Sequence, residues 1–505
     1  MVVDVAGGPL GWSEVERVVS GPIVPVVAPA AYAAVRAGRE ALCRAASCGT
    51  VVYGMTTGVG ALKGCGYEGE DRLAFGRTMA LAHDVAVGCA VDPGLARLAL
   101  AVRLNTLMTG RVGVTEGFVA HLHDLLTHDV LPCLKKGGSV GCGDLAQLGQ
   151  LASLMVGEGQ ALWRGQEMAA MDALHAAGLA PYAMQPREGL AAVASNAFGV
   201  AACVASVGRL RRVWWQVCDQ VAVLLPAWGL DARVWEAALT SNVPAERAIA
   251  AWLLRLDASE QAMRVPPKVH DPLSGRFLIQ VLAACGTAIE EASHAVLEAT
   301  AQVDDNPVLL ADGRVVPSGG SHHAMLALRL HALQGAVAML ARNLVNQCTV
   351  LTNGVLPGLT VNLVPEGKVG TGYGPLMKAA MEQSVRVAAA SVPVTPLVEV
   401  LAAGLEDEAL LLPLVAERLD DQVEALAWLT TIALVTSVRA AELRDMRVGP
   451  LAAFWMAEVD RHIPPGCADR PLSSALSQIR AGWWSMRGAA GAAPWEAAGC
   501  LSTTA

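Results

Sequence analysis

The clearest pattern along the chain is a set of long stretches in which apolar residues recur every three or four positions. This spacing places apolar side chains on one face of a helix. Pro413 is the only proline inside these stretches, so little would interrupt the helices. The stretches cover residues 95–108, 282–303, 324–348, 377–390 and 405–443. The pattern predicts a mainly α-helical protein built as a bundle of long helices.

Strand-like and glycine-rich segments are short and lie between the apolar stretches. Residues 50–53 and 313–316 have strand patterns, and the second of them follows a turn at Asp312 and Gly313. Polar and reactive residues gather in the glycine-rich segments, which we expect to be loops that carry the functional site. These segments are residues 54–60, 137–143, 319–320 and 367–374.

No low-complexity linker cuts the 505 residues into independent pieces. We divide the chain into three parts. Residues 1–200 form an N-terminal mixed domain that contains the first two glycine-rich segments. Residues 201–450 form a central bundle of long helices, and residues 451–505 form a C-terminal helical extension.

Composition adds an expectation about assembly. Apolar residues make up 53% of the chain and charged residues 16%, whereas about 25% charged is usual. A surface this poor in charge is normally covered by another protomer, so we expect a homo-oligomer. Residues 189–208 and 343–365 are uncharged and long enough to cross a membrane, but small and polar residues dilute both, which favours burial in the bundle.

Charge and cysteine usage exclude several classes of partner. The net charge is −9 and no long basic run is present, so nucleic acid is not expected. The 12 cysteines lack metal-ligand spacing and a disulfide framework, which fits thiols in a reducing compartment. The first residues do not have the pattern of a secretory signal. We therefore expect a cytoplasmic protein that acts on a small molecule without a membrane partner.

Two glycine-rich motifs carry candidate chemistry. YGMTTGVG at residues 53–60 puts Tyr53 at the mouth of a loop, and His83 follows in LAHD at residues 81–84. Taken alone, a tyrosine in this position is more often a packed aromatic than a catalytic residue. GSVGCGDLA at residues 138–146 opens what looks like a helix. Further motifs follow in order: REGLA at 187–191, HDPLSGR at 270–276, DNP at 305–307, SGG at 318–320 with His323, and LED at 405–407.

Together these motifs resemble the aromatic amino acid lyase family, of the histidine ammonia-lyase type, over roughly residues 51–443. The resemblance implies a homotetramer of long helical bundles. It also implies that loops of more than one subunit assemble each active site.

The resemblance implies roles for individual residues. The tyrosine of the first loop, here Tyr53, is the base that removes the β-proton in this family. The arginine that ends HDPLSGR, Arg276, binds the substrate carboxylate, and Glu406 lies near the substrate amine. We assign His83 and Asn196 to the substrate pocket.

The decisive departure from the family lies in the second glycine-rich loop. Relatives carry Ala-Ser-Gly there, which cyclises and dehydrates to a methylidene-imidazolone electrophile. Here Gly141, Cys142 and Gly143 make a loop that is one residue shorter and has no serine. Ala194 stands where relatives have an asparagine that holds the group, and Asn196 is out of step with it. We therefore expect no prosthetic group and no other cofactor.

Other departures concern the pocket. Tyr373 and Lys378 lie in the segment that faces the site in relatives, and we assign both to catalysis, although a surface lysine is an equal reading of Lys378. His270 and His322 stand where the histidine-specific pattern has glutamine and phenylalanine, so we assign both to a refitted substrate pocket. A metal site is disfavoured because His322 and the adjacent His323 would point apart and no further ligand has suitable spacing.

Without the electrophile, the substrate must bring its own leaving group, which a quaternary trimethylammonium is. Tyr53 would take the β-proton while Lys378 stabilises charge on a nearby ring. A neighbouring cation would have to lower the tyrosine pKa from its usual value of about 10. This logic indicates the electrophile-free branch of the family, which expels trimethylamine from ergothioneine to give thiourocanate. Hercynine and other betaines remain open as substrates.

Two other functions remain open. The first is an ammonia-lyase or aminomutase that builds its electrophile from Cys142. The second is an inactive member of the family that serves as a binding or scaffold protein, although retention of Tyr53, Arg276 and Glu406 would then be unexplained.

Overall fold

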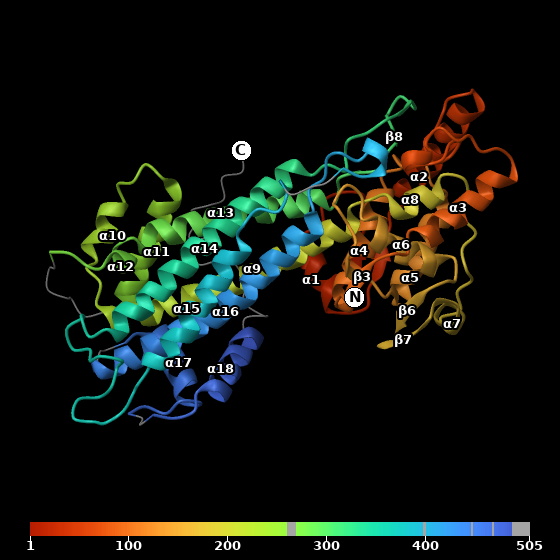
Figure 1. The fold of residues 1–505 in the computed structure, drawn as a ribbon. Helices are drawn as coiled ribbons and strands as arrows, with labels where there is room; N and C mark the ends of the chain where they lie inside the picture. The colour runs from red at the N-terminus through yellow and green to blue at the C-terminus, as the bar shows by residue number, and fades with distance from the viewer. Residues whose placement is uncertain (260–268, 397–399, 446–447, 467–468, 487–505) are drawn as a thin grey trace. The chain divides into compact units, whose positions relative to one another are not determined.

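The computed structural model describes residues 1–259, 269–396, 400–445, 448–466 and 469–486 (Figure 1). Its internal contacts divide the chain into two units. Unit 1 comprises Met1–Ser206, Ser293–Leu328 and Pro393–Glu417, and unit 2 comprises Val207–Ala292, Arg329–Val392 and Arg418–Ala505. The three-part division at residues 200 and 450 stays a prediction. Residues 487–505 of its C-terminal extension lie outside the described residues.

The chain is mainly helical, as predicted. Four long helices contribute residues to both units and are the longest ribbons in Figure 1: α9 (Ala197–Trp228), α13 (Leu278–Ala299), α14 (Ala324–Thr352) and α16 (Leu412–Leu443). The remaining helices of unit 2 are α10 (Arg233–Ala238), α11 (Pro244–Ser259), α12 (Leu273–Arg276), α15 (Gly374–Ala390), α17 (Pro450–Asp460) and α18 (Ser473–Met486).

Unit 1 combines shorter helices with small sheets. Its helices are α1 (Trp12–Ser20), α2 (Pro29–Ser47), η1 (Gly60–Leu62), α3 (Glu70–Ala82), α4 (Pro93–Leu107), α5 (Glu116–Thr127), α6 (Leu145–Met155), α7 (Ala170–Ala176), α8 (Glu188–Val193) and η2 (Ala402–Gly404). Strand β1 (Val2–Asp4) pairs in parallel with β2 (Val24–Val26). The other pairings are antiparallel: β3 (Val87–Ala90) with β5 (Lys135–Gly137), β4 (Val130–Pro132) with β6 (Gln160–Trp163), β6 with β7 (Gln166–Ala169), and β8 (Val308–Leu309) with β9 (Val315–Val316).

Two sequence predictions change in the structure. The helix expected from residue 405 begins at Leu412, because Pro413 fits the first turn of a helix but not its interior. The strand expected at residues 50–53 is wrong, and the chain turns there instead. The Thr56 side chain explains the turn, since its Oγ1 accepts the Val52 N–H at 2.9 Å while the Thr56 N–H donates to the Val52 carbonyl. The second predicted strand is confirmed at β9.

Polar contacts fix the packing of the long helices within unit 2. The Gln220 amide of α9 donates to Ser437 Oγ of α16 at 3.1 Å. The buried Gln422 amide of α16 donates to the Gln334 carbonyl of α14 and to the Val387 carbonyl of α15, at 3.1 and 2.9 Å. Because a buried amide must find partners, these bonds favour one register of the helices.

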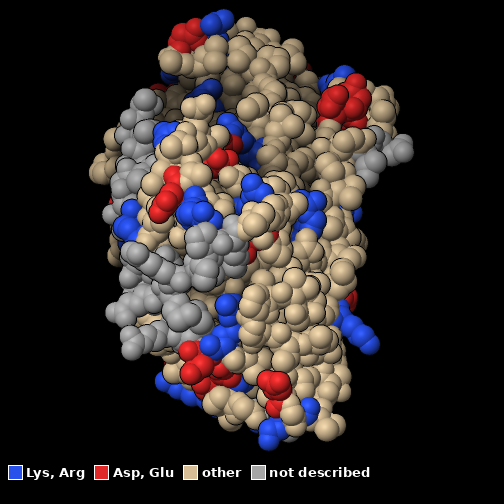
Figure 2. Space-filling view, turned by 90° about the vertical axis from the view of Figure 1, so that its left-hand side faces the viewer, with Lys and Arg blue, Asp and Glu red and all other residues tan. Residues whose placement is uncertain are grey.

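Within the described part of the chain, three segments are long and apolar enough to cross a membrane by length and composition alone: Glu188–Trp228, α14 and α16. The most apolar window of the first is 83% buried inside the protein and that of α16 is 89% buried, so packing accounts for their apolar character. In α14 only 50% of this window is buried. Figure 2 shows one face of the molecule, on which charged side chains are scattered among wide uncharged areas.

Helix α14 leaves one continuous stripe of residues exposed. The exposed positions alternate in steps of three and four, which is the spacing of a coiled-coil seam. We call this the α14 stripe, and it consists of Met325, Leu328, Ala332, Gly335, Met339, Arg342, Asn346 and Thr349. Five of these eight residues are apolar or glycine, so this face of the helix is poorly suited to water.

Candidate active site

The second glycine-rich loop leads directly into α6. Gly141 and Gly143 have φ angles of 79° and 108°, in the region that favours glycine. A side chain at Gly141 would also place its Cβ 2.6 Å from the backbone nitrogen of Leu412. The loop is therefore pressed against the start of α16, and the Leu411 N–H donates to the Val140 carbonyl at 2.8 Å.

A buried carboxyl group connects the Cys142 loop to the start of α9. Asp144 is fully buried, and its side-chain oxygens accept hydrogen bonds from Ser139 Oγ at 2.6 Å and from the Gly199 N–H at 2.7 Å. Burial raises the pKa of Asp144 to about 6, although both hydrogen bonds act in the opposite direction. The loop therefore closes on a carboxyl group that ionises only near neutral pH.

Asn196 contacts the same loop. The Gly143 N–H donates to Asn196 Oδ1 at 2.6 Å, and the Asn196 amide nitrogen donates to the Ser321 carbonyl. Asn196 is completely buried, so both ends of its amide are used inside the protein. Its assignment to the substrate pocket stays a prediction, and in this structure it holds the loop.

Cys142 and Glu406 lie near each other at this loop. The Cys142 thiol is half-buried, and burial together with the negative charge of Glu406 raises its pKa above the usual range. Glu406 is also half-buried, and its backbone bridges to Leu401 on either side of η2. Helix η2 packs against η1, which belongs to the Tyr53 loop. Unit 1 therefore gathers both glycine-rich loops and Glu406 in one region.

Tyr53 is held by its own loop. Its hydroxyl accepts the Gly60 N–H at 2.7 Å, and the side chain is half-buried. Gly54, with φ 68°, brings the turn so close to α8 that a Cβ would lie 2.3 Å from a methyl carbon of Leu190. Close approach to α8 thus explains the glycine that follows the tyrosine.

Arg187 is a functional candidate that the sequence analysis did not single out. It precedes α8, is buried, and interacts electrostatically with Tyr53. Burial lowers its pKa to about 10, while nearby Asp305, 3.9 Å away, raises it. Its guanidinium donates to the carbonyls of Asn306 and Pro307 at 3.1 and 2.9 Å. The REGLA and DNP motifs contain these residues, but only the fold brings Arg187 within electrostatic range of Tyr53.

His83 and His322 are the two other residues of unit 1 that we assign to the substrate pocket, and they are held less firmly than Tyr53 and Asn196. His83 ends α3, and its Nδ1 hydrogen-bonds the Met79 carbonyl at 2.8 Å. His322 is exposed, with its Nε2 4.0 Å from a carboxylate oxygen of Glu408. Their substrate contacts stay predictions.

Arg276 and His270 belong to unit 2, where both are exposed and line a cavity of about 920 Å³. Phe277 and Met339 line it too, so the cavity adjoins the α14 stripe. Among the residues the structure describes, none forms an ion pair with Arg276. The guanidinium is therefore available for a carboxylate from outside the unit.

Tyr373 and Lys378 lie at the start of α15, also in unit 2. Tyr373 is buried, and its hydroxyl accepts a hydrogen bond from Arg439 Nε at 2.9 Å. Arg439 is in turn paired with Glu442. Lys378 is exposed on α15, and no acidic group within the described ranges pairs with it. Their catalytic assignment stays a prediction.

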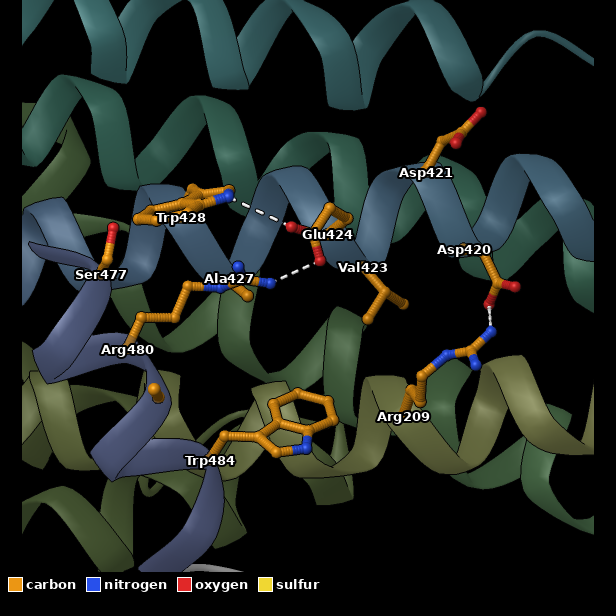
Figure 3. Close-up of a pocket in the computed structure, with 11 residues that line it drawn as sticks. Arg209, Asp420, Asp421, Val423, Glu424, Ala427, Trp428, Ser477, Arg480 and Trp484 are labelled. Atoms are coloured by element: carbon orange, nitrogen blue, oxygen red, sulfur yellow. Dashed lines mark hydrogen bonds and ion pairs between the residues drawn. The ribbon is translucent and has the colours of Figure 1, made fainter. Parts of the chain in front are cut away.

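A second cavity in unit 2, of about 680 Å³, lies between α9, α16 and α18 (Figure 3). None of the predicted site residues lines it. Figure 3 shows that Arg209 reaches Asp420 and Arg480 reaches Glu424, so these four charges neutralise one another within the lining.

Residues 10–461 match the model of the aromatic amino acid lyase family. The chain belongs to this family. It is 28% identical over 471 residues to histidine ammonia-lyase of Burkholderia multivorans, covering 91% of this chain and 92% of the relative.

Solved structures share the fold. Ergothionase from Treponema denticola, an ergothioneine degrading enzyme solved with desmethyl-ergothioneine sulfonic acid, superposes with a TM-score of 0.89 at 21% identity, covering 97% of this chain and 99% of that one. Histidine ammonia-lyase from Trypanosoma cruzi superposes with a TM-score of 0.88 at 21% identity, covering 100% and 98%. The predicted family and fold class are therefore confirmed.

The loop residues of this lyase do not fit the prosthetic group of its relatives. No serine is present between Val140 and Asp144, and the Gly143 amide that would close the ring donates to Asn196 instead. Nor is a group of three or more histidine, cysteine or acidic side chains placed to hold a metal ion within the described ranges.

Proposed function

We propose that this lyase breaks a carbon–nitrogen bond by eliminating trimethylamine from a betaine of a histidine-like amino acid, with ergothioneine as substrate and thiourocanate as product. The observation that carries the proposal is the loop around Cys142, which lacks serine and whose Gly143 amide is bound to Asn196. An enzyme without the electrophile requires a substrate whose nitrogen is already a good leaving group.

The elimination assigns a task to each group in unit 1. The Tyr53 phenolate takes the β-proton, the electrons of that C–H bond form the α,β double bond, and trimethylamine leaves with the electrons of the C–N bond. Arg187 supplies the buried positive charge that a tyrosine base needs nearby. The Glu406 carboxylate attracts the trimethylammonium group or the ring.

Unit 2 supplies the remaining groups in this proposal. Arg276 binds the substrate carboxylate and Lys378 stabilises charge that develops on the ring. Tyr373, whose hydroxyl already binds Arg439, takes part in proton handling or in holding the start of α15. His270 of unit 2 shapes the pocket together with His83 and His322 of unit 1.

We further propose that the enzyme is a cytoplasmic homotetramer whose sites combine groups from different copies. The α14 stripe supports this because its spacing suits packing against another helix. Met339 belongs both to the stripe and to the cavity that contains Arg276. A second copy seated on the stripe would therefore lie beside Arg276.

A substrate panel tests the proposed reaction. The full-length protein is incubated separately with ergothioneine, hercynine and histidine, and the conjugated acrylate product is followed in the ultraviolet while trimethylamine is quantified. We expect release of trimethylamine from ergothioneine and no ammonia from histidine. Activity on histidine alone would contradict the proposal, and full activity of Lys378→Met would remove that residue from the mechanism.

Intact mass separates this function from the alternative with a Cys142-derived electrophile. Cyclisation and elimination at Cys142 would remove one water and one hydrogen sulfide from the chain. We expect the unmodified mass. A chain lighter by both molecules would favour the ammonia-lyase or aminomutase alternative, and an unmodified chain with no activity on any betaine would favour the scaffold alternative.

A further inference from the structure

A pair of buried ionisable side chains lies next to Asn196. Asp304 and His323 are both almost completely buried, and the His323 Nε2 is 3.8 Å from Asp304 Oδ2. That distance exceeds a hydrogen bond, so the two ionisable groups lie close together without a direct bond between them. Neither residue belongs to the reaction proposed above.

Asp304 is bonded to the turn that carries Asn196. Its Oδ2 accepts the Asn196 N–H at 2.5 Å and the Ser195 hydroxyl at 3.3 Å. The Ser195 carbonyl then accepts the Asp144 N–H at 2.6 Å, and Asn196 Oδ1 accepts the Gly143 N–H. One carboxylate oxygen is thus linked through this turn to both residues that follow Cys142.

The remaining polar atoms of the pair are not used for hydrogen bonding. Asp304 Oδ1 and His323 Nε2 are buried and have no hydrogen-bond partner among the described residues. A buried carboxylate that lacks full hydrogen bonding is costly unless a positive charge compensates it. Asp144 and Arg103 also lie within electrostatic range of Asp304. Arg103 is already engaged by two hydrogen bonds to Asp305, which leaves His323 as the closest counter-charge.

We propose that Asp304 and His323 form a buried carboxylate–imidazolium pair that positions the Cys142 loop through Asn196. Both are positioning residues, since neither touches the reacting atoms. Neutralising one member leaves the other as an uncompensated buried charge, so the turn at Asn196 shifts and the loop loosens. Neutralising both removes the charge imbalance, and the loop regains its position.

The proposal is tested by the alkylation of Cys142 in the full-length protein without substrate. Iodoacetamide labelling is followed by peptide mass analysis in wild type, Asp304→Asn, His323→Gln and the double variant. Asparagine keeps an oxygen that can accept the Asn196 N–H, so Asp304→Asn removes mainly charge. We expect each single variant to label Cys142 about tenfold faster, and the double variant to return to within about threefold of wild type.

Other cysteines report whether the effect is local. Cys203, Cys218, Cys285 and Cys348 are buried and must stay unlabelled, because general unfolding would expose them too. Asp129→Asn is the matched control, since Asp129 is paired with the buried Arg97 and has no bond to the loop. It should leave Cys142 labelling unchanged. If Asp304→Asn does not fold, His323→Gln and its labelling rate decide the matter.

Kinetics give a second measurement. With ergothioneine, the single variants should lose kcat about tenfold with little change in KM, because the Arg276 cavity is untouched. Labelling of Cys142 at the wild-type rate in folded single variants would overturn the positioning role. This inference rests on the proposed function only for its kinetic part. A wild-type protein that is inactive on every betaine would refute the function, while altered labelling would still support the pair.

Discussion

The two units present their candidate groups in different ways. In unit 1, the half-buried Tyr53 is held by a hydrogen bond from its own loop, and the fully buried Asn196 is held by one from the Cys142 loop. In unit 2, Arg276 and Lys378 are exposed and unpaired within the described residues. Long exposed side chains keep much of their rotamer freedom, which opposes precise binding. Unit 1 therefore holds Tyr53 and Asn196 in place, whereas Arg276 and Lys378 of unit 2, unlike the buried Tyr373, are not ordered by ion pairs within the described residues.

The largest expected effect concerns the preorganised base. Tyr53→Phe keeps the ring but removes the hydroxyl, which accepts the Gly60 N–H and which we propose as the base. Without this base, trimethylamine release should fall about 10³-fold in kcat, equivalent to about 4 kcal/mol. Steady-state kinetics with ergothioneine measure this. Tyr67→Phe, on the same loop region and stacked on Phe75, is the matched control and should retain activity. Equal activity of both variants would exclude Tyr53 as the base.

The next prediction tests whether the buried Asp144 carboxyl, which holds the Cys142 loop in unit 1, lowers the unfolding free energy of the protein. Asp144 has a pKa of about 6 in the folded protein against 3.8 in the unfolded chain, so the folded state keeps its proton to higher pH. Unfolding free energy of the wild type should therefore fall by about 3 kcal/mol as pH rises from about 4 to 7. Asp144→Asn cannot ionise and should escape this loss.

Urea unfolding of wild type and variant at several pH values measures the difference between them. The difference in unfolding free energy should grow by about 3 kcal/mol in favour of Asp144→Asn as pH rises from about 4 to 7. For Asp312→Asn, the difference in unfolding free energy from wild type should change little with pH. Arg314 lowers the pKa of Asp312, so this carboxyl is ionised in both the folded and the unfolded state across this range. A flat difference for Asp144→Asn as well would show that its carboxyl group ionises normally.

A smaller effect tests whether unit 2 acts through another copy. Arg276→Gln should raise KM for ergothioneine about 10- to 100-fold, or about 1.4 to 2.7 kcal/mol, with a smaller change in kcat. Arg386→Gln, an exposed arginine paired with Glu382, is the control. Co-expression of Arg276→Gln with Tyr53→Phe should restore activity to about a quarter of wild type if each site combines two copies at random. Absence of any recovery would place both residues in a site made by one copy.

The smallest effect concerns the α14 stripe. Met339→Glu puts a charge into a surface that we propose another copy covers, which should weaken assembly by about 1 to 2 kcal/mol. In a dilution series followed by light scattering, the variant should dissociate into a smaller species at a higher protein concentration than the wild type does. Leu239 has the same exposure, 41%, and lies outside the stripe, so Leu239→Glu should assemble normally. Identical behaviour of the two variants would remove the stripe from the interface.

The sequence predicted the helices better than it predicted the turns. Apolar spacing is a local property, and it identified the helices that became α13, α14, α15 and α16. The strand expected at residues 50–53 failed because Thr56 offers the backbone another hydrogen-bond partner. Apolar β-branched residues alone did not reveal that competition.

The candidate site shows the same limit. The ordered motifs identified the family, and the missing serine beside Cys142 could be read directly from the sequence. Asn196 was judged out of step with the family asparagine, yet its amide meets Gly143 in the fold. Spacing along the chain could not show this contact, because the two partners are 53 positions apart.

By itself the sequence determined the helical class, the family and the altered loop, since periodicity and motif order depend only on residue identity. Tertiary structure alone decided that Arg187 lies within electrostatic range of Tyr53, that the Tyr373 hydroxyl binds Arg439, and that Asp304 binds the Asn196 N–H. Each of these facts depends on burial and on hydrogen bonds between segments distant in sequence. Such contacts form only when the whole core has packed.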